Sequence, residues 1–128
     1  MKIKGKFPST RLRRIRNSSW MRNLVSENQL SINDLILPIF ITEGKNKIEK
    51  IKTMPGIKRY SVDKLNVIMK KAIKQKIQMV ALFPHVSKKK KDLYGSEAIN
   101  KNNLVCKSIR MIKKKYPKVG IMCDVALD

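Results

Sequence analysis

Three short, largely apolar runs rich in β-branched residues recur at nearly equal intervals along the chain. They cover residues 35–41, 79–83 and 119–128. The step from Phe40 to Phe83 is 43 residues, and the step from Phe83 to Val125 is 42 residues. Runs of this kind are typical of strands buried on both faces of a parallel sheet. The spacing therefore predicts a repeating unit of one strand and one helix.

Helical periodicity fills the intervals between the runs. Apolar side chains recur at a spacing of 3.6 residues from Val62 to Ile73, where Ser61 is the expected cap, and a further helix is predicted from about Asn103 to Tyr116. The segment 42–59 is predicted to be a long polar loop, so we expect three strands. Strand, helix, strand, helix, strand in this order predicts a parallel α/β sheet with right-handed crossovers.

Near-equal units favour a TIM (βα)8 barrel. Eight units of this size need roughly 340 residues, which is within the range of barrel enzymes. We therefore expect an N-terminal arm and the first three βα strands of an incomplete barrel, truncated after strand three, with sheet edges that a closed barrel would pair. A doubly wound sheet is the alternative, although no glycine-rich phosphate loop follows the first run.

Two prolines and one histidine lie within or next to the predicted strands. Pro38 removes a donor from the first run, which indicates a bulge or an edge position. Pro84 is expected to end the second strand and to leave His85 just beyond it. A lone histidine there is either a solvated bystander or a residue near the mouth of a site.

The N-terminal 17 residues form a basic arm with too few apolar residues to fold alone, and we expect residues 18–128 to belong to one barrel domain. The arm either packs on a partner subunit or nucleic acid, or is a frayed terminus. Ser18 and Ser19 offer caps for a short helix, in which Trp20 and Leu24 form a stripe that we expect to pack in the core.

The formal net charge of +21 brings nucleic-acid binding into consideration. The 30 basic residues are 23 lysines and 7 arginines spread over every predicted helix and loop, and the aromatic residues do not alternate with them as in base-stacking surfaces. A solvated surface is the favoured interpretation, so we expect no nucleic acid as partner. A nucleic-acid-binding protein and a non-catalytic basic fragment stay open as alternatives.

No apolar run reaches the ~18 residues that a membrane-spanning helix requires, and no apolar signal core follows the basic start. We therefore expect a cytoplasmic location and no membrane partner. Cys106 and Cys123 have neither the spacing of a zinc site nor that of a disulfide framework, so we expect both to be packing residues.

Two carboxylates interrupt the third run. An ionised aspartate in apolar surroundings needs an ion pair, hydrogen bonds or a metal, so Asp124 and Asp128 indicate a site better than they indicate packing. Alternate residues of a strand share one face, which places both carboxylates and Ala126 on the same side. By the same alternation Cys123 faces the helices.

Six motifs, in order along nearly the whole chain, resemble the N-terminal portion of the porphobilinogen synthase (delta-aminolevulinic acid dehydratase) family. They are Thr10-Arg11-Leu12-Arg13-Arg14, Leu35-Ile36-Leu37-Pro38-Ile39-Phe40, Met54-Pro55-Gly56, Ala81-Leu82-Phe83-Pro84, Gly95-Ser96-Glu97-Ala98 with Asn100, and Asp124-Val125-Ala126-Leu127-Asp128. The resemblance implies a TIM-barrel lyase of tetrapyrrole and heme biosynthesis that condenses two 5-aminolevulinate molecules into porphobilinogen. It also implies a homo-octamer in which the N-terminal arm wraps a neighbouring subunit.

The resemblance also implies roles for individual residues. Asp124 matches the family's catalytic aspartate beside the Schiff-base lysines, which lie in later strands, so the 128-residue chain alone is expected to be inactive. Ala126 and Asp128 match two of the three positions that are cysteines in zinc-dependent members. Ala126 offers no ligand atom and Asp128 offers a hard oxygen, so we expect no zinc and take Asp128 as a candidate Mg²⁺ position.

Overall fold

The computed structural model describes residues 5–11 and 13–124. Ala126 and Asp128 therefore lie outside the described residues. The chain divides into two compact units, residues 1–30 and 31–128. The division between arm and barrel expected after residue 17 stays a prediction.

The first unit contains a 3-10 turn, η1 (Arg14–Arg16), and one short helix, α1 (Ser19–Leu24). The expected core packing of α1 is wrong here, because Trp20 is 63% exposed and Leu24 is 78% exposed. A helix of six residues has too small an apolar face to bury two large side chains by itself.

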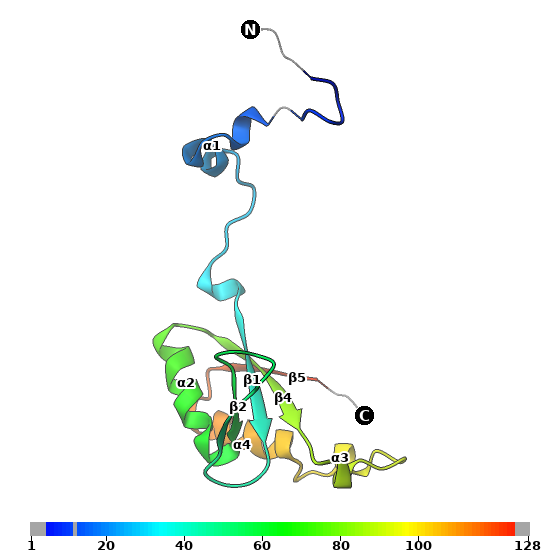
Figure 1. Ribbon diagram of the computed structural model, residues 1–128. Helices are drawn as coiled ribbons and strands as arrows, with labels where there is room; N and C mark the ends of the chain where they lie inside the picture. Colours follow the sequence, from blue (N-terminus) through cyan, green and yellow to red (C-terminus); the bar gives the residue numbers. More distant parts are fainter. Residues whose placement is uncertain (1–4, 12, 125–128) are drawn as a thin grey trace. The chain divides into compact units, whose positions relative to one another are not determined.

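The second unit is built on a five-stranded sheet with the order β2-β3-β1-β4-β5 (Figure 1). Its strands are β1 (Ile36–Thr42), β2 (Ile48–Lys50), β3 (Lys58–Ser61), β4 (Met79–His85) and β5 (Gly120–Cys123). Strands β3, β1, β4 and β5 run parallel, which confirms the predicted parallel pairing of the three apolar runs. Strand β2 is antiparallel to β3.

The predicted long loop is wrong in part, because it contains β2 and the start of β3. These strands have only three and four residues, and lysine, arginine and glutamate occupy most of their positions. Their sequences lack the apolar pattern on which strand prediction depends. They form because β1 offers β3 a parallel partner, with Phe40 opposite Arg59.

Helices α2 (Leu65–Lys74) and α4 (Leu104–Lys115) pack on one face of the sheet, as predicted for two crossover helices (Figure 1). The 3-10 turn η3 (Val62–Lys64) precedes α2. Ser61 does not cap this helix as expected; its hydroxyl instead accepts the backbone N–H of Lys47 at 2.9 Å. Asn103 does cap α4, because its side-chain oxygen accepts the N–H of Cys106 at 2.8 Å.

The core lies between the sheet and the two helices. Its fully buried residues include Ile39, Ile41, Val80, Leu82, Leu65, Met69 and Ile112. The alternate residues of the strands face the other way, and large apolar members of that set remain exposed: Ile36 is 42%, Phe83 is 38% and Met122 is 45% exposed. The sheet therefore has one face packed on helices and one apolar face without comparable burial among residues 31–124.

The two strand prolines are accommodated without the expected interruption. Pro38 lies in the middle of the unbroken β1–β4 register, opposite Ala81, so the predicted bulge is wrong. Pairing of β1 with β3 begins only at Phe40, so Pro38 has a strand neighbour on one side only, and the alternative of a local edge position is confirmed. Pro84 does not end β4, which continues to His85.

Candidate active site

The carboxyl ends of the parallel strands meet at one edge of the sheet. Thr42 at the end of β1 is level with His85 at the end of β4, and Cys123 at the end of β5 is level with Leu82. This is the edge at which parallel α/β enzymes carry their reacting groups. His85 is exposed there as the last residue of β4, and Asp124 directly follows β5.

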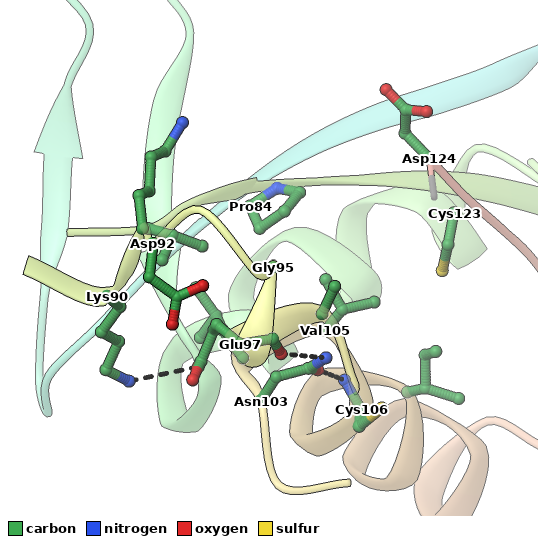
Figure 2. A pocket seen from close by; sticks show the side chains of 15 residues that line it. Pro84, Lys90, Asp92, Gly95, Glu97, Asn103, Val105, Cys106, Cys123 and Asp124 are labelled. Carbon is green, nitrogen blue, oxygen red and sulfur yellow. Dashed lines mark hydrogen bonds and ion pairs between the residues drawn. The ribbon is translucent and has the colours of Figure 1, made fainter. Parts of the chain in front are cut away.

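Asp124 is exposed, and its carboxylate points away from the thiol of Cys123 (Figure 2). Cys123 packs against the core cluster, which confirms that it faces the helices. Asp124 consequently belongs to the sheet face opposite the helices, where a carboxylate can meet a ligand in solvent.

Aromatic side chains lie on the same sheet face, close to the level of Asp124. The rings of Phe40 and Phe83 are 5.6 Å apart between centroids and tilted by 31°. Because Leu82 is opposite Cys123, the next residues in register are Phe83 and Asp124. An apolar surface therefore borders the carboxylate on the strand next to it.

The two cysteines are close enough to influence each other. Burial, and then the neighbouring Cys106, raise the pKa of the Cys123 thiol. Both side chains line a pocket of about 300 Å³ between the end of β4, the start of α4 and the end of β5. The expected packing role fits Cys123, since a thiol with a raised pKa is held neutral and unreactive.

The loop between β4 and α4 forms one wall of this pocket. It contains a 3-10 turn, η4 (Lys88–Lys90), and a single helical turn, α3 (Ser96–Ile99). Asp92 accepts the N–H groups of Tyr94 and Ser96, each at 3.0 Å, and these bonds, Ser96 first, lower the pKa of the Asp92 carboxyl. The loop thus has a defined shape although its residues are mostly exposed.

Lys90 joins this loop to the segment after β1. Its ammonium lies 2.7 Å from Glu43 and 3.3 Å from Glu97, and the second contact is visible in Figure 2. Glu43 first and then Glu97 raise the pKa of Lys90. The side-chain amide of Asn100 and the ammonium of Lys90 lower the pKa of Glu97. Sequence reasoning missed this cluster, because a run of four lysines does not indicate which of them has a partner.

The described residues do not assemble a metal site. Among residues 5–11 and 13–124, no group of three histidine, cysteine or acidic side chains is placed to hold an ion. Asp124 is the one member of the candidate metal motif within the described part, so the expected Mg²⁺ position at Asp128 stays a prediction. No helix described in the same residues is long and apolar enough to cross a bilayer.

Comparison with known proteins identifies close relatives over nearly the whole chain. A family model, delta-aminolevulinic acid dehydratase, matches residues 9–128. The enzyme of that name from Bradyrhizobium diazoefficiens is 48% identical over 118 residues, which are 92% of this chain and 33% of the relative. The one from Methanothermus sociabilis is 44% identical over 122 residues, which are 95% of this chain and 37% of the relative.

A solved structure agrees with these sequence matches. The delta-aminolevulinic acid dehydratase (porphobilinogen synthase) of Toxoplasma gondii, in complex with the reaction product porphobilinogen, superposes with a TM-score of 0.80 at 32% identity. The match covers 92% of this chain and 33% of that one. The chain therefore spans about a third of the length of the relatives that it matches.

Proposed function

The chain belongs to the delta-aminolevulinic acid dehydratase family, and from this we propose that the full-length enzyme, meaning this chain continued to the length of its relatives, is a porphobilinogen synthase. It condenses two molecules of 5-aminolevulinate into porphobilinogen with loss of two waters, as a lyase of heme and tetrapyrrole biosynthesis. The match of the family model over residues 9–128 carries this proposal.

The proposed architecture is the first part of a TIM barrel. Four parallel strands with two helices on one face, and exposed apolar side chains on the other, suit a sheet that continues and closes on itself. In such a barrel the face with Phe83 and Met122 becomes the interior. Asp124 then projects from a strand end into the mouth, where barrel enzymes carry their chemistry.

Asp124 is the proposed catalytic residue of this chain. Its carboxylate can orient an amine or accept a proton from it, and imine formation between a substrate carbonyl and a lysine amine requires such proton transfers. The lysines that form the imines lie, by the family resemblance, in later strands. The chain of 128 residues alone is accordingly proposed to be inactive.

Assembly and location are parts of the same proposal. A homo-octamer is proposed, with the basic N-terminal arm as the contact to a neighbouring subunit. The exposed apolar side chains of the first unit, including Trp20 and Leu24, suit a segment that packs on another chain. A cytoplasmic location, with neither nucleic acid nor membrane as partner, completes the proposal.

The direct test is an assay of the purified full-length enzyme with 5-aminolevulinate. Porphobilinogen should appear at half the rate at which 5-aminolevulinate disappears, since two substrates give one product. The 128-residue chain, assayed at the same concentration, should give none. A full-length enzyme that is folded and does not form porphobilinogen over a range of pH and divalent metal ions would contradict the proposal.

A further inference from the structure

Lys90 forms ion pairs with two of the few acidic side chains of this chain. The sequence has 30 basic residues and only 9 acidic ones. Two of the three ion pairs found among residues 5–11 and 13–124 nevertheless involve Lys90, while the third joins Lys47 and Glu49 at 3.8 Å. In a chain with so few carboxylates, convergence of two of them on one lysine indicates a specific structural role.

The two carboxylates come from separate parts of the fold. Glu43 directly follows β1, and Glu97 lies in α3, within the loop that follows β4. Lys90 therefore connects the segments that leave two neighbouring strands at the edge where Asp124 projects. The contacts are only partly shielded, because the side chain of Lys90 is 46% exposed and those of Glu43 and Glu97 are 33% and 20% exposed.

The loop that Lys90 holds and the end of β5 form walls of the same pocket. Lys90, Asp92 and Glu97 line the same pocket as Cys123 and Asp124. Lys90 itself is not free to bind an anionic ligand, because two carboxylates already surround its one positive charge. Its effect on chemistry must therefore act through the position of the loop.

We propose that Lys90 is a positioning residue: by bridging Glu43 and Glu97 it holds residues 86–99 in place beside the end of β5, from which Asp124 projects. This inference rests on the proposed function. A loosened loop has to become ordered again when substrate binds, which costs free energy. This cost is the same in the enzyme–substrate complex and in the transition state. Loss of Lys90 therefore raises KM for 5-aminolevulinate and leaves kcat nearly unchanged.

The test compares Lys90→Met with Lys90→Arg and Lys89→Met in the full-length enzyme. Partly exposed ion pairs contribute modestly, so Lys90→Met should raise KM about three- to tenfold. Lys90→Arg keeps the charge and should restore a KM near that of the wild type. Lys89→Met removes an exposed lysine of the same run and should change nothing. In a Glu43→Gln, Glu97→Gln background, Lys90→Met should add no further change.

Hydrogen exchange separates this inference from the proposed function. The amides of Ser96 and Ala98 are hydrogen-bonded within the loop, so they should exchange faster in Lys90→Met than in Lys89→Met, whatever the enzyme catalyses. Faster exchange with an unchanged KM would overturn the positioning role, and so would unchanged exchange. If Lys90→Met does not fold, Glu43→Gln and Glu97→Gln each replace it, and an unchanged KM in both would equally overturn the proposal.

Discussion

Cys123 and Asp124 are consecutive residues whose side chains leave the end of β5 in opposite directions (Figure 2). The thiol packs toward the helices and the carboxylate lies on the opposite, uncovered face of the sheet. This alternation is a direct consequence of strand geometry. It separates a residue that serves packing from one that is available for chemistry.

We expect Asp124→Asn in the full-length enzyme to lower kcat for porphobilinogen formation by about 10²- to 10⁴-fold, the usual contribution of a positioned acid or base. The amide has nearly the same shape and cannot accept the proton. Steady-state kinetics would measure the effect. Glu49→Gln, which neutralises a half-exposed carboxylate of β2 that pairs with Lys47, is the matched control and should keep wild-type activity. Equal activity in both variants would remove Asp124 from the catalytic centre.

The thiol of Cys123 should be slow to alkylate. Because burial raises its pKa, the fraction of reactive thiolate near neutral pH is smaller than in an unfolded peptide. Iodoacetamide labelling followed by mass spectrometry, at pH values from 7 to about 10, should show slow modification at neutral pH, with a steep rise at alkaline pH. The same segment in denatured protein serves as the control. Rapid labelling of the native protein at neutral pH would contradict the buried environment.

The raised pKa of the Cys123 thiol also makes the free energy of unfolding depend on pH. A thiol whose folded-state pKa is raised binds its proton more tightly in the folded state. Its contribution to stability is fully present below the unfolded pKa and is lost as the pH rises through the folded value. Cys123→Ser should therefore reduce the loss of stability on the alkaline side, which denaturant midpoints at neutral and alkaline pH would measure.

Two isoleucines on the crossover helices offer a matched test of the core. Ile112 of α4 is fully buried, whereas Ile73 of α2 is 43% exposed. We expect Ile112→Ala to lower the free energy of unfolding by about 2–5 kcal/mol, through lost burial and the cavity that remains. Ile73→Ala should cost about 1 kcal/mol or less. The denaturant midpoints of the two variants would measure the difference, and equal losses would mean that the core is placed wrongly.

The fold could be predicted where the apolar pattern is strong. A continuous or periodic set of large apolar side chains is buried in each of the strands β1, β4 and β5 and in each of the helices α2 and α4. This apolar pattern can be recognised in the sequence. Strands β2 and β3 were missed because tertiary pairing with β1 specifies them. The same reason applies to Pro38, because the strands that pair with β1 decide between the bulge and the edge position that its sequence left open.

Only those features of the candidate site that depend on neighbouring residues of one strand could be predicted from the sequence. Alternation along one strand is enough to place Asp124 and Cys123 on opposite faces. The cluster around Lys90 joins residues 43, 90 and 97, which no local pattern connects. Within the run Lys88–Lys91 the sequence offers four equivalent cations, and the backbone path of the loop selects one of them.

The expected metal dependence of the full-length enzyme follows from the chemistry of three positions. Catalytic zinc sites favour thiolate or imidazole ligands, whereas Ala126 has no ligand atom and Asp128 has a hard oxygen suited to Mg²⁺. In an extended strand Asp124 and Asp128 are about 13 Å apart, so they bind one ion together only if the chain bends after Leu127. We therefore expect the full-length enzyme to keep its activity in a zinc-selective chelator and to respond, if it responds to a metal, to magnesium. Stoichiometric zinc by elemental analysis, with activity lost on its removal, would show that the assignment is wrong.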